Sequence, residues 1–155
     1  MDLAEAIEDL QTGITHYKLI VVNQDSKDLI NECKSLDLDG MVKINVTKLL
    51  TENLLVDKTP EEKEYDTWDL MKTYLNSMDF KIFVLFDVEY MFSPELGNLD
   101  VINILEYYSR NGCIIILFIK AKLIDNHLIY SKEGYCDYKV MDISNANVVG
   151  WDNEN

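Results

Sequence analysis

"YKLIVVNQDSKDLINECK" (residues 17–34) predicts a buried strand that runs through a short polar turn into a helix. The run from Leu19 to Val22 is continuously apolar and mostly β-branched, which is typical of a strand covered on both faces. Asp25 or Ser26 can cap the helix that follows, because short polar side chains accept hydrogen bonds from its first N–H groups. In α/β proteins a phosphate is often held at this junction. The stretch therefore raises the question of a nucleotide site.

Strand and helix patterns alternate along the rest of the chain. Apolar runs predict strands at residues 40–46, 81–92 and 113–119, and helical spacing predicts helices at 1–12, 57–78 and 99–110 with a helical turn at 47–55. A hairpin is expected within residues 126–143. Strands that are apolar on both faces are typical of parallel sheets, so we expect an α/β fold. It would form a single three-layer domain with a mainly parallel sheet over residues 1–143, followed by a polar C-terminal tail at 144–155 that frays.

The composition describes an acidic globular protein. Its 155 residues fit one domain, and 28 acidic against 14 basic residues give a net charge of −14, which disfavours unaided binding to nucleic-acid phosphates. The three cysteines lack metal-ligand spacing, the N-terminus does not resemble a signal peptide, and the longest apolar run is too short to cross a bilayer. We therefore expect a cytoplasmic protein with no membrane segment and no direct nucleic-acid partner of its own.

Polar side chains follow the predicted strands at the edge where α/β sheets bind ligands. "IFVLFDVE" has the form of a Walker B segment, in which Asp87 can hold the hydration shell of Mg²⁺ and Glu89 can orient a water. An ordinary turn or capping role for Asp87 stays open. The candidates after the other strands are Asn23, Gln24, Asp25, Ser26 and Lys27, and then Lys120 and Lys122.

The turn after the first strand lacks the glycines of a phosphate loop. Such a loop has the form GxxxxGK[ST], in which glycines let successive backbone N–H groups turn inward around the phosphates. None of the six glycines lies between residues 14 and 39, and Asp28 stands where the hydroxyl residue is expected. Asp25 and Asp28 would also repel a triphosphate. The turn therefore predicts a degenerate or weak nucleotide site, and we do not expect a conventional ATPase.

Several segments of the chain are distinctive when taken together: "HYKLIVVNQDSKDLI" (16–30), "VKINVTKLLTENLL" (42–55), "FVLFDVEYMFSPELGNLDVINILEYYSRNGCIIILF" (83–118) and "LIYSKEGYCDYKVMDI" (128–143). Together they resemble the BrxF family, the small P-loop proteins of BREX bacteriophage-defence systems. The resemblance implies a P-loop NTPase-like fold, ATP with Mg²⁺ as cofactor, and other defence-system proteins as partners. It implies Walker B roles for Asp87 and Glu89, with Asp87 as the metal residue. It places residues 23–27 at the phosphate loop, with Lys27 as its lysine.

Arg110 matches the arginine of the same family, and it is the only arginine of the chain. Its planar guanidinium can bind a phosphate or carboxylate through two hydrogen bonds. The alternative is a positive charge that complements the C-terminal end of a helix dipole. The resemblance leaves open whether the chain forms a homo-oligomer.

The net charge supports a second hypothesis of another class. An acidic interaction or inhibitor protein, antitoxin-like or a mimic of DNA, would present carboxylates on one face to a basic partner. If the carboxylates are instead spread evenly over the surface, the negative charge would only keep the protein soluble. The aromatic residues Tyr65, Trp68, Tyr107, Tyr108 and Tyr130 are expected in the core or at its rim, and a subset of them in an interface patch.

Overall fold

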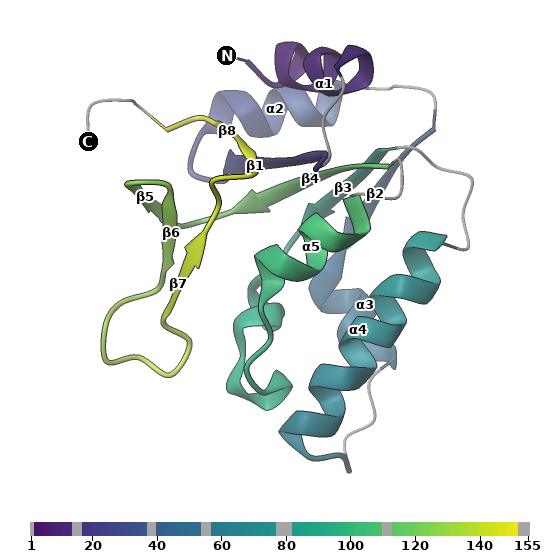
Figure 1. Cartoon of the computed structure of the whole chain (residues 1–155), viewed down its shortest axis with the longest axis vertical. Helices are drawn as coiled ribbons and strands as arrows, with labels where there is room; N and C mark the ends of the chain where they lie inside the picture. Colours follow the sequence, from purple (N-terminus) through teal and green to yellow (C-terminus); the bar gives the residue numbers. More distant parts are fainter. Residues whose placement is uncertain are drawn as a thin grey trace.

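The computed structural model describes residues 2–13, 17–36, 40–53, 57–76, 82–109 and 113–151. Figure 1 shows helices on both faces of a central sheet, with a smaller sheet beside it. The helices are α1 (Leu3–Thr12), α2 (Lys27–Ser35), α3 (Val46–Asn53), α4 (Pro60–Asn76) and α5 (Val101–Ser109). The strands are β1 (Leu19–Asn23), β2 (Met41–Asn45), β3 (Ile82–Phe86), β4 (Ile114–Ile119), β5 (Lys122–Ile124), β6 (His127–Tyr130), β7 (Lys139–Asp142) and β8 (Asn147–Val149), and short 3-10 helices are η1 (Glu89–Phe92) and η2 (Pro94–Leu96).

The larger sheet has five strands in the order β2-β3-β4-β1-β8, and every neighbouring pair is parallel. Successive side chains of a strand point to opposite faces, so β1 contributes to two cores. Ile20 and Val22 pack with α1 and α2, whereas Leu19 and Val21 pack in the core shared by α3, α4 and α5. The expected α/β fold with a mainly parallel sheet between helical layers is confirmed.

Local sequence signals explain where two of the helices begin. Asp2 caps α1 because its Oδ1 accepts a hydrogen bond from the Glu5 N–H (2.8 Å). Before α4, the Thr59 hydroxyl accepts from the Glu62 N–H (3.2 Å), and the Glu62 carboxylate accepts from the Thr59 N–H (3.3 Å). This reciprocal pair is a capping box, and it satisfies two N–H groups that the helix itself leaves unpaired.

One expectation about a strand and one about the C-terminal tail are wrong. The strand expected at 81–92 ends at Phe86, and residues 89–92 form η1 instead. The tail expected at 144–155 does not fray at residues 147–149, which form β8 and pair with β1 at the edge of the sheet. Val149 is buried there, and the Trp151 indole N–H donates to the Ala121 carbonyl (3.1 Å). Strand pairing, the burial of Val149 and the indole hydrogen bond therefore hold this segment beyond the boundary expected at residue 143.

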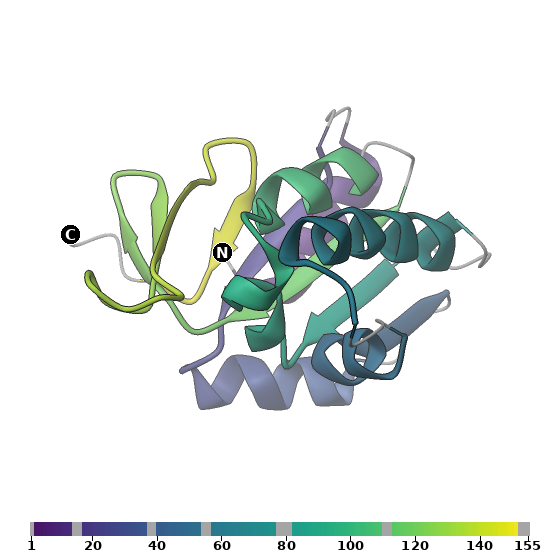
Figure 2. The same ribbon diagram turned by 90° about the horizontal axis from the view of Figure 1, so that it is seen from below.

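The hairpin expected within residues 126–143 is part of a second sheet. β5, β6 and β7 form three antiparallel strands that lie beside the larger sheet (Figure 2). Leu128 and Met141, opposite each other on β6 and β7, are buried in the core that also contains α5. Among the described residues, none of the helices is both long and apolar enough to cross a membrane.

Candidate functional site

The turn after β1 uses its backbone N–H groups within the protein. The Gln24 N–H donates to the Ile119 carbonyl at the end of β4 (3.0 Å). The Asp25 N–H donates to Oδ1 of Asn23 (3.0 Å), and the Ser26 N–H donates to the Asn23 carbonyl (3.2 Å). Each of the three N–H groups between β1 and α2 therefore already has an acceptor. As folded, the turn does not present them to a phosphate.

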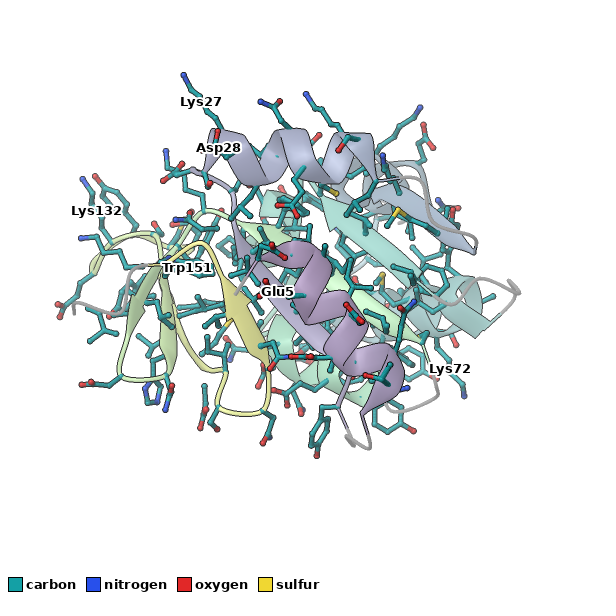
Figure 3. All side chains as sticks on the ribbon, turned by 90° about the horizontal axis from the view of Figure 1, so that it is seen from above. Glu5, Lys27, Asp28, Lys72, Lys132 and Trp151 are labelled. Atoms are coloured by element: carbon teal, nitrogen blue, oxygen red, sulfur yellow. The ribbon has the colours of Figure 1, made fainter. Side chains whose placement is uncertain are left out.

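Ser26 caps α2, because its hydroxyl accepts from the Leu29 N–H (3.4 Å). Lys27 is the first residue of the helix, and its side chain is exposed. Figure 3 shows Lys27 extending from the start of α2 away from the body of the molecule. The structure therefore does not bring the predicted phosphate-loop lysine to the end of β3.

Asp87 follows β3 in the left-handed region of backbone space, with φ of +50°. That conformation is uncommon for a residue other than glycine, although aspartate tolerates it better than most. The Asp87 carboxylate accepts from the Asn45 side-chain amide (2.8 Å), and its carbonyl accepts from the Thr47 N–H (2.9 Å) and hydroxyl (2.6 Å). Asp87 thus ties the end of β3 to the start of α3. The turn role that the sequence left open for Asp87 is present in the structure.

Four of the predicted site residues line two different pockets. Gln24 and Asp87 line a pocket of about 250 Å³ beside α2, which we call the apolar pocket; its other lining residues are Ile30, Cys33, Lys34, Lys43, Val84, Phe86 and Phe118. Asp25 and Glu89 line a second pocket of about 380 Å³, which we call the lysine pocket. It is completed by Lys120, Ala121, Lys122, Ile129, Tyr130, Ser131, Lys132 and Asp137. Neither pocket is lined by Lys27.

The lysine pocket carries three basic and three acidic side chains. The Lys120 ammonium lies 4.0 Å from Oδ1 of Asp25, and both side chains are well exposed, so this pair is weak. Burial raises the pKa of the Tyr130 hydroxyl, and the nearby carboxylates of Glu89 and Asp137 raise it further. Tyr130 also stacks on Phe92 at a centroid distance of 4.0 Å. The Tyr130 ring therefore forms an uncharged side of the lysine pocket.

Asn45, which donates to Asp87, and Lys132, which lines the lysine pocket, are site residues that the sequence patterns did not indicate. Asn45 ends β2, so the rule that polar residues at strand ends mark the ligand edge could have found it. Lys132 lies in the loop between β6 and β7, and no local pattern relates that loop to the end of β1. Its position depends on how the second sheet packs.

Arg110 lies outside the described residues, so the structure does not place it. Its neighbour Ser109 is buried, and the Ser109 hydroxyl accepts from the Lys18 N–H (3.1 Å) and donates to the Glu106 carbonyl (2.8 Å). Ser109 therefore joins the end of α5 to the start of β1.

The described residues do not fit a conventional Mg²⁺–ATP site. The N–H groups of the turn are engaged, and the Asp87 carboxylate already accepts from Asn45. In the described part of the chain, no group of three or more His, Cys, Asp or Glu side chains could together hold a metal ion.

Comparisons with protein-family models, curated proteins and solved structures find no significant match to this chain. The structure itself defines an α/β protein with a parallel five-stranded sheet flanked by helices.

Proposed function

We propose that this chain is a small P-loop NTPase-like subunit of a BREX-type bacterial anti-phage defence system that acts through protein contacts. Its nucleotide site is degenerate. The resemblance to the BrxF family supports the proposal, and so does the arrangement of the sheet. The turn after β1 and Asp87 after β3 open on the same edge of a parallel sheet, with β4 between the two strands.

The observation that supports a degenerate nucleotide site is that the N–H groups of the turn between β1 and α2 are already hydrogen-bonded within the protein. A phosphate held there would need the N–H groups of Gln24, Asp25 and Ser26, and each of them donates within the protein. A typical intramolecular hydrogen bond contributes about 1 kcal/mol, so opening the turn would cost a few kcal/mol before any phosphate is bound. The Asp25 and Asp28 carboxylates beside the turn would add repulsion.

ATP is therefore expected to leave the thermal stability of the protein unchanged. With ATP and Mg²⁺ at millimolar concentration, we expect the melting temperature to move by less than about 1 °C, because a ligand stabilises only when it exceeds its Kd. A shift that Lys27→Ala together with Asp87→Ala abolishes would establish a functioning ATP site and contradict the degenerate one. A shift that persists in this double variant would place nucleotide elsewhere and would equally contradict the proposal.

Two exposed tyrosines, one on α4 and one on α5, together with a half-buried tryptophan of α4, form the surface that we propose for protein contacts. The aromatic patch consists of Tyr65, Trp68 and Tyr107. Trp68 packs edge-on against Tyr107 at a centroid distance of 6.3 Å, and the Tyr108 hydroxyl donates to the Trp68 carbonyl (2.9 Å). Tyr65, one turn earlier on α4, is 72% exposed, and Tyr107 is 54% exposed. Tyrosine and tryptophan are enriched at protein interfaces, which favours this patch over the charged surface around it.

Affinity capture from the native host tests the proposed partners. We expect the tagged chain to retain a BREX-type methyltransferase or a phosphatase-like protein encoded beside it. Tyr65→Ser with Tyr107→Ser should abolish this capture, because large apolar anchors dominate interface energies. Tyr135→Ser is the matched control, since Tyr135 is a 61% exposed tyrosine in the loop between β6 and β7. Capture of no defence component, or equal capture by both variants, would contradict the proposal.

The surface charge favours the acidic interaction protein as the second candidate. The exposed side of α1 carries the carboxylates of Asp2, Glu5, Glu8 and Asp9, and the helix contains no lysine or arginine. Within the described ranges, only Lys58–Asp66 and Lys120–Asp25 form ion pairs. In the same capture experiment, a basic protein that is released by moderate salt would support this candidate instead.

A further inference from the structure

A groove of about 560 Å³ lies between β7 and α5, and we call it the edge groove. All of β7 lines it on one side, and Asp100, Asn103 and Glu106 line it from the start of α5 and from the helix itself. Figures 1 and 2 both show β7 as the strand of the smaller sheet that faces α5. Sites of roughly 300–1,000 Å³ accept ligands of drug size, so the edge groove has room for a few residues of extended chain.

The backbone of β7 has a free edge toward this groove. Among the described strands β7 pairs with β6 alone. The Ile143 N–H donates to the Asn126 carbonyl (2.9 Å), which marks this pair as one that bonds across the ladder. Bonded and non-bonded pairs alternate in an antiparallel ladder, so Val140 and Asp142 belong to non-bonded pairs. Their N–H and C=O groups therefore point away from β6, and both residues line the edge groove.

The charge of the edge groove is negative, because three carboxylates and one ammonium line it. The Lys139 ammonium donates to the Leu99 carbonyl (2.8 Å), so it is held at one place in the groove. Burial raises the pKa of the Glu106 carboxyl, and the carboxylates of Asp142 and Asp100 raise it further. These carboxylates therefore repel one another, and a positive charge that enters the groove would be attracted to them.

We propose that the free edge of β7 takes up an extended, basic segment of a partner protein as a fourth strand of the smaller sheet. The backbone of that segment pairs with Val140 and Asp142, as in other complexes in which a peptide adds to a sheet edge. Its lysine or arginine side chains lie near the carboxylates of the edge groove. A second copy of this chain fits less well, because its net charge is −14 and like charges would meet. This inference does not depend on the proposed defence role.

Two capped peptides of about six residues test the charge preference, one alternating lysine with valine and the other glutamate with valine. Titration with the lysine peptide should move the backbone amide NMR signals of Val140 and Asp142. We expect the glutamate peptide to bind at least about tenfold more weakly, because its carboxylates meet those of the groove. Unmoved signals at Val140 and Asp142, or equal affinity of the two peptides, would overturn the proposal.

Backbone pairing is tested on both partners. Methylation of every backbone nitrogen of the lysine peptide should weaken binding about tenfold, since the peptide loses its donors. Val140→Pro removes one groove-facing N–H of the protein, and proline is tolerated on an edge strand where its nitrogen faces away from the ladder. We expect it to weaken binding about tenfold, whereas the control Val140→Ala keeps the N–H and the affinity. Unchanged affinity of the methylated peptide would refute strand addition, even if Val140→Pro does not fold.

Asp100→Asn with Asp142→Asn removes two charges from the edge groove and keeps two acceptors. Oδ1 of Asp100 accepts from the Asn103 N–H (3.1 Å), and Oδ1 of Asp142 accepts from the Ser144 N–H (2.8 Å). The lysine peptide should bind this variant about fivefold more weakly.

Glu5→Gln with Glu8→Gln is the matched control, because it removes the same charge from the exposed side of α1. We expect this control to keep the affinity of the unaltered protein. An equal loss in both double variants would mean that only the net charge attracts the peptide, and it would contradict the proposed site. Movement of the Val140 and Asp142 signals when the protein is concentrated without peptide would assign the edge to a second copy and overturn the basic partner.

Discussion

Phe83→Ala is expected to lower the free energy of unfolding by about 3–5 kcal/mol, as large-to-small substitutions of a buried phenylalanine do. Phe83 is fully buried in the middle of β3, between Val42 of β2 and Ile115 of β4. Its ring belongs to the core between the sheet and α3, α4 and α5, so its loss leaves a cavity that the surrounding strands cannot close. Because domains are stable by only about 5–15 kcal/mol, this single change would remove much of the stability.

Urea denaturation of both proteins measures this loss. Val140→Ala is the control, because Val140 on β7 is 51% exposed and should lose less than about 0.5 kcal/mol. A loss below about 1 kcal/mol for Phe83→Ala would contradict the packing of β3 that positions Asp87.

Gly150→Ala is expected to destabilise the protein by about 2–4 kcal/mol, the sum of backbone strain and overpacking. Gly150 has a φ of +96°, which residues with a Cβ rarely adopt. A Cβ at this position would collide with Cδ1 of Leu29 and would lie 3.0 Å from Cβ of Asn23. The Gly150 carbonyl also accepts from the Asn23 side-chain amide (3.0 Å), so the collision falls on the contact that holds the C-terminal segment to the turn after β1.

Gly134→Ala separates the two causes. Gly134 has nearly the same φ, +94°, but a Cβ there would meet nothing within 4 Å. Its substitution should cost only the backbone strain, about 1–2 kcal/mol. Chemical denaturation of the two variants should therefore differ by roughly 1–2 kcal/mol, which measures the packing of Gly150. Equal losses would mean that residues 144–151 do not pack against the turn.

Much of the fold could be predicted from the residues, because the apolar patterns are strong and local. The runs at Leu19–Val22 and Ile114–Ile119 are apolar at every position, and both are strands buried on two faces of a parallel sheet. The cap at Ser26 and the capping box of Thr59 and Glu62 follow from short-range hydrogen bonds that sequence spacing reveals. The edge position of the turn and Asp87 follows from the same alternation, since parallel strands end at one side.

Other features depended on contacts between distant segments. β8 consists of only three residues in a polar stretch, and it is a strand because β1 offers its free edge and Val149 finds a buried site. The strand at β3 ended early because Asp87 turned into a left-handed conformation and bonded to residues of β2 and α3. Neither the formation of β8 nor the early end of β3 is indicated by the residues close to it in the sequence.

The residue pattern is enough to indicate an acidic α/β protein with polar residues at the ends of its parallel strands and no glycine in the turn after β1. How those polar residues are used depends on the assembled fold. In the folded protein the Ile119 carbonyl of β4 accepts a hydrogen bond from the turn, and Lys27 points outward. Gln24 and Asp25 line different pockets. The physical reason is that hydrogen bonds and burial at a strand end are satisfied by neighbours far away in the chain, whose proximity arises only when the sheet assembles.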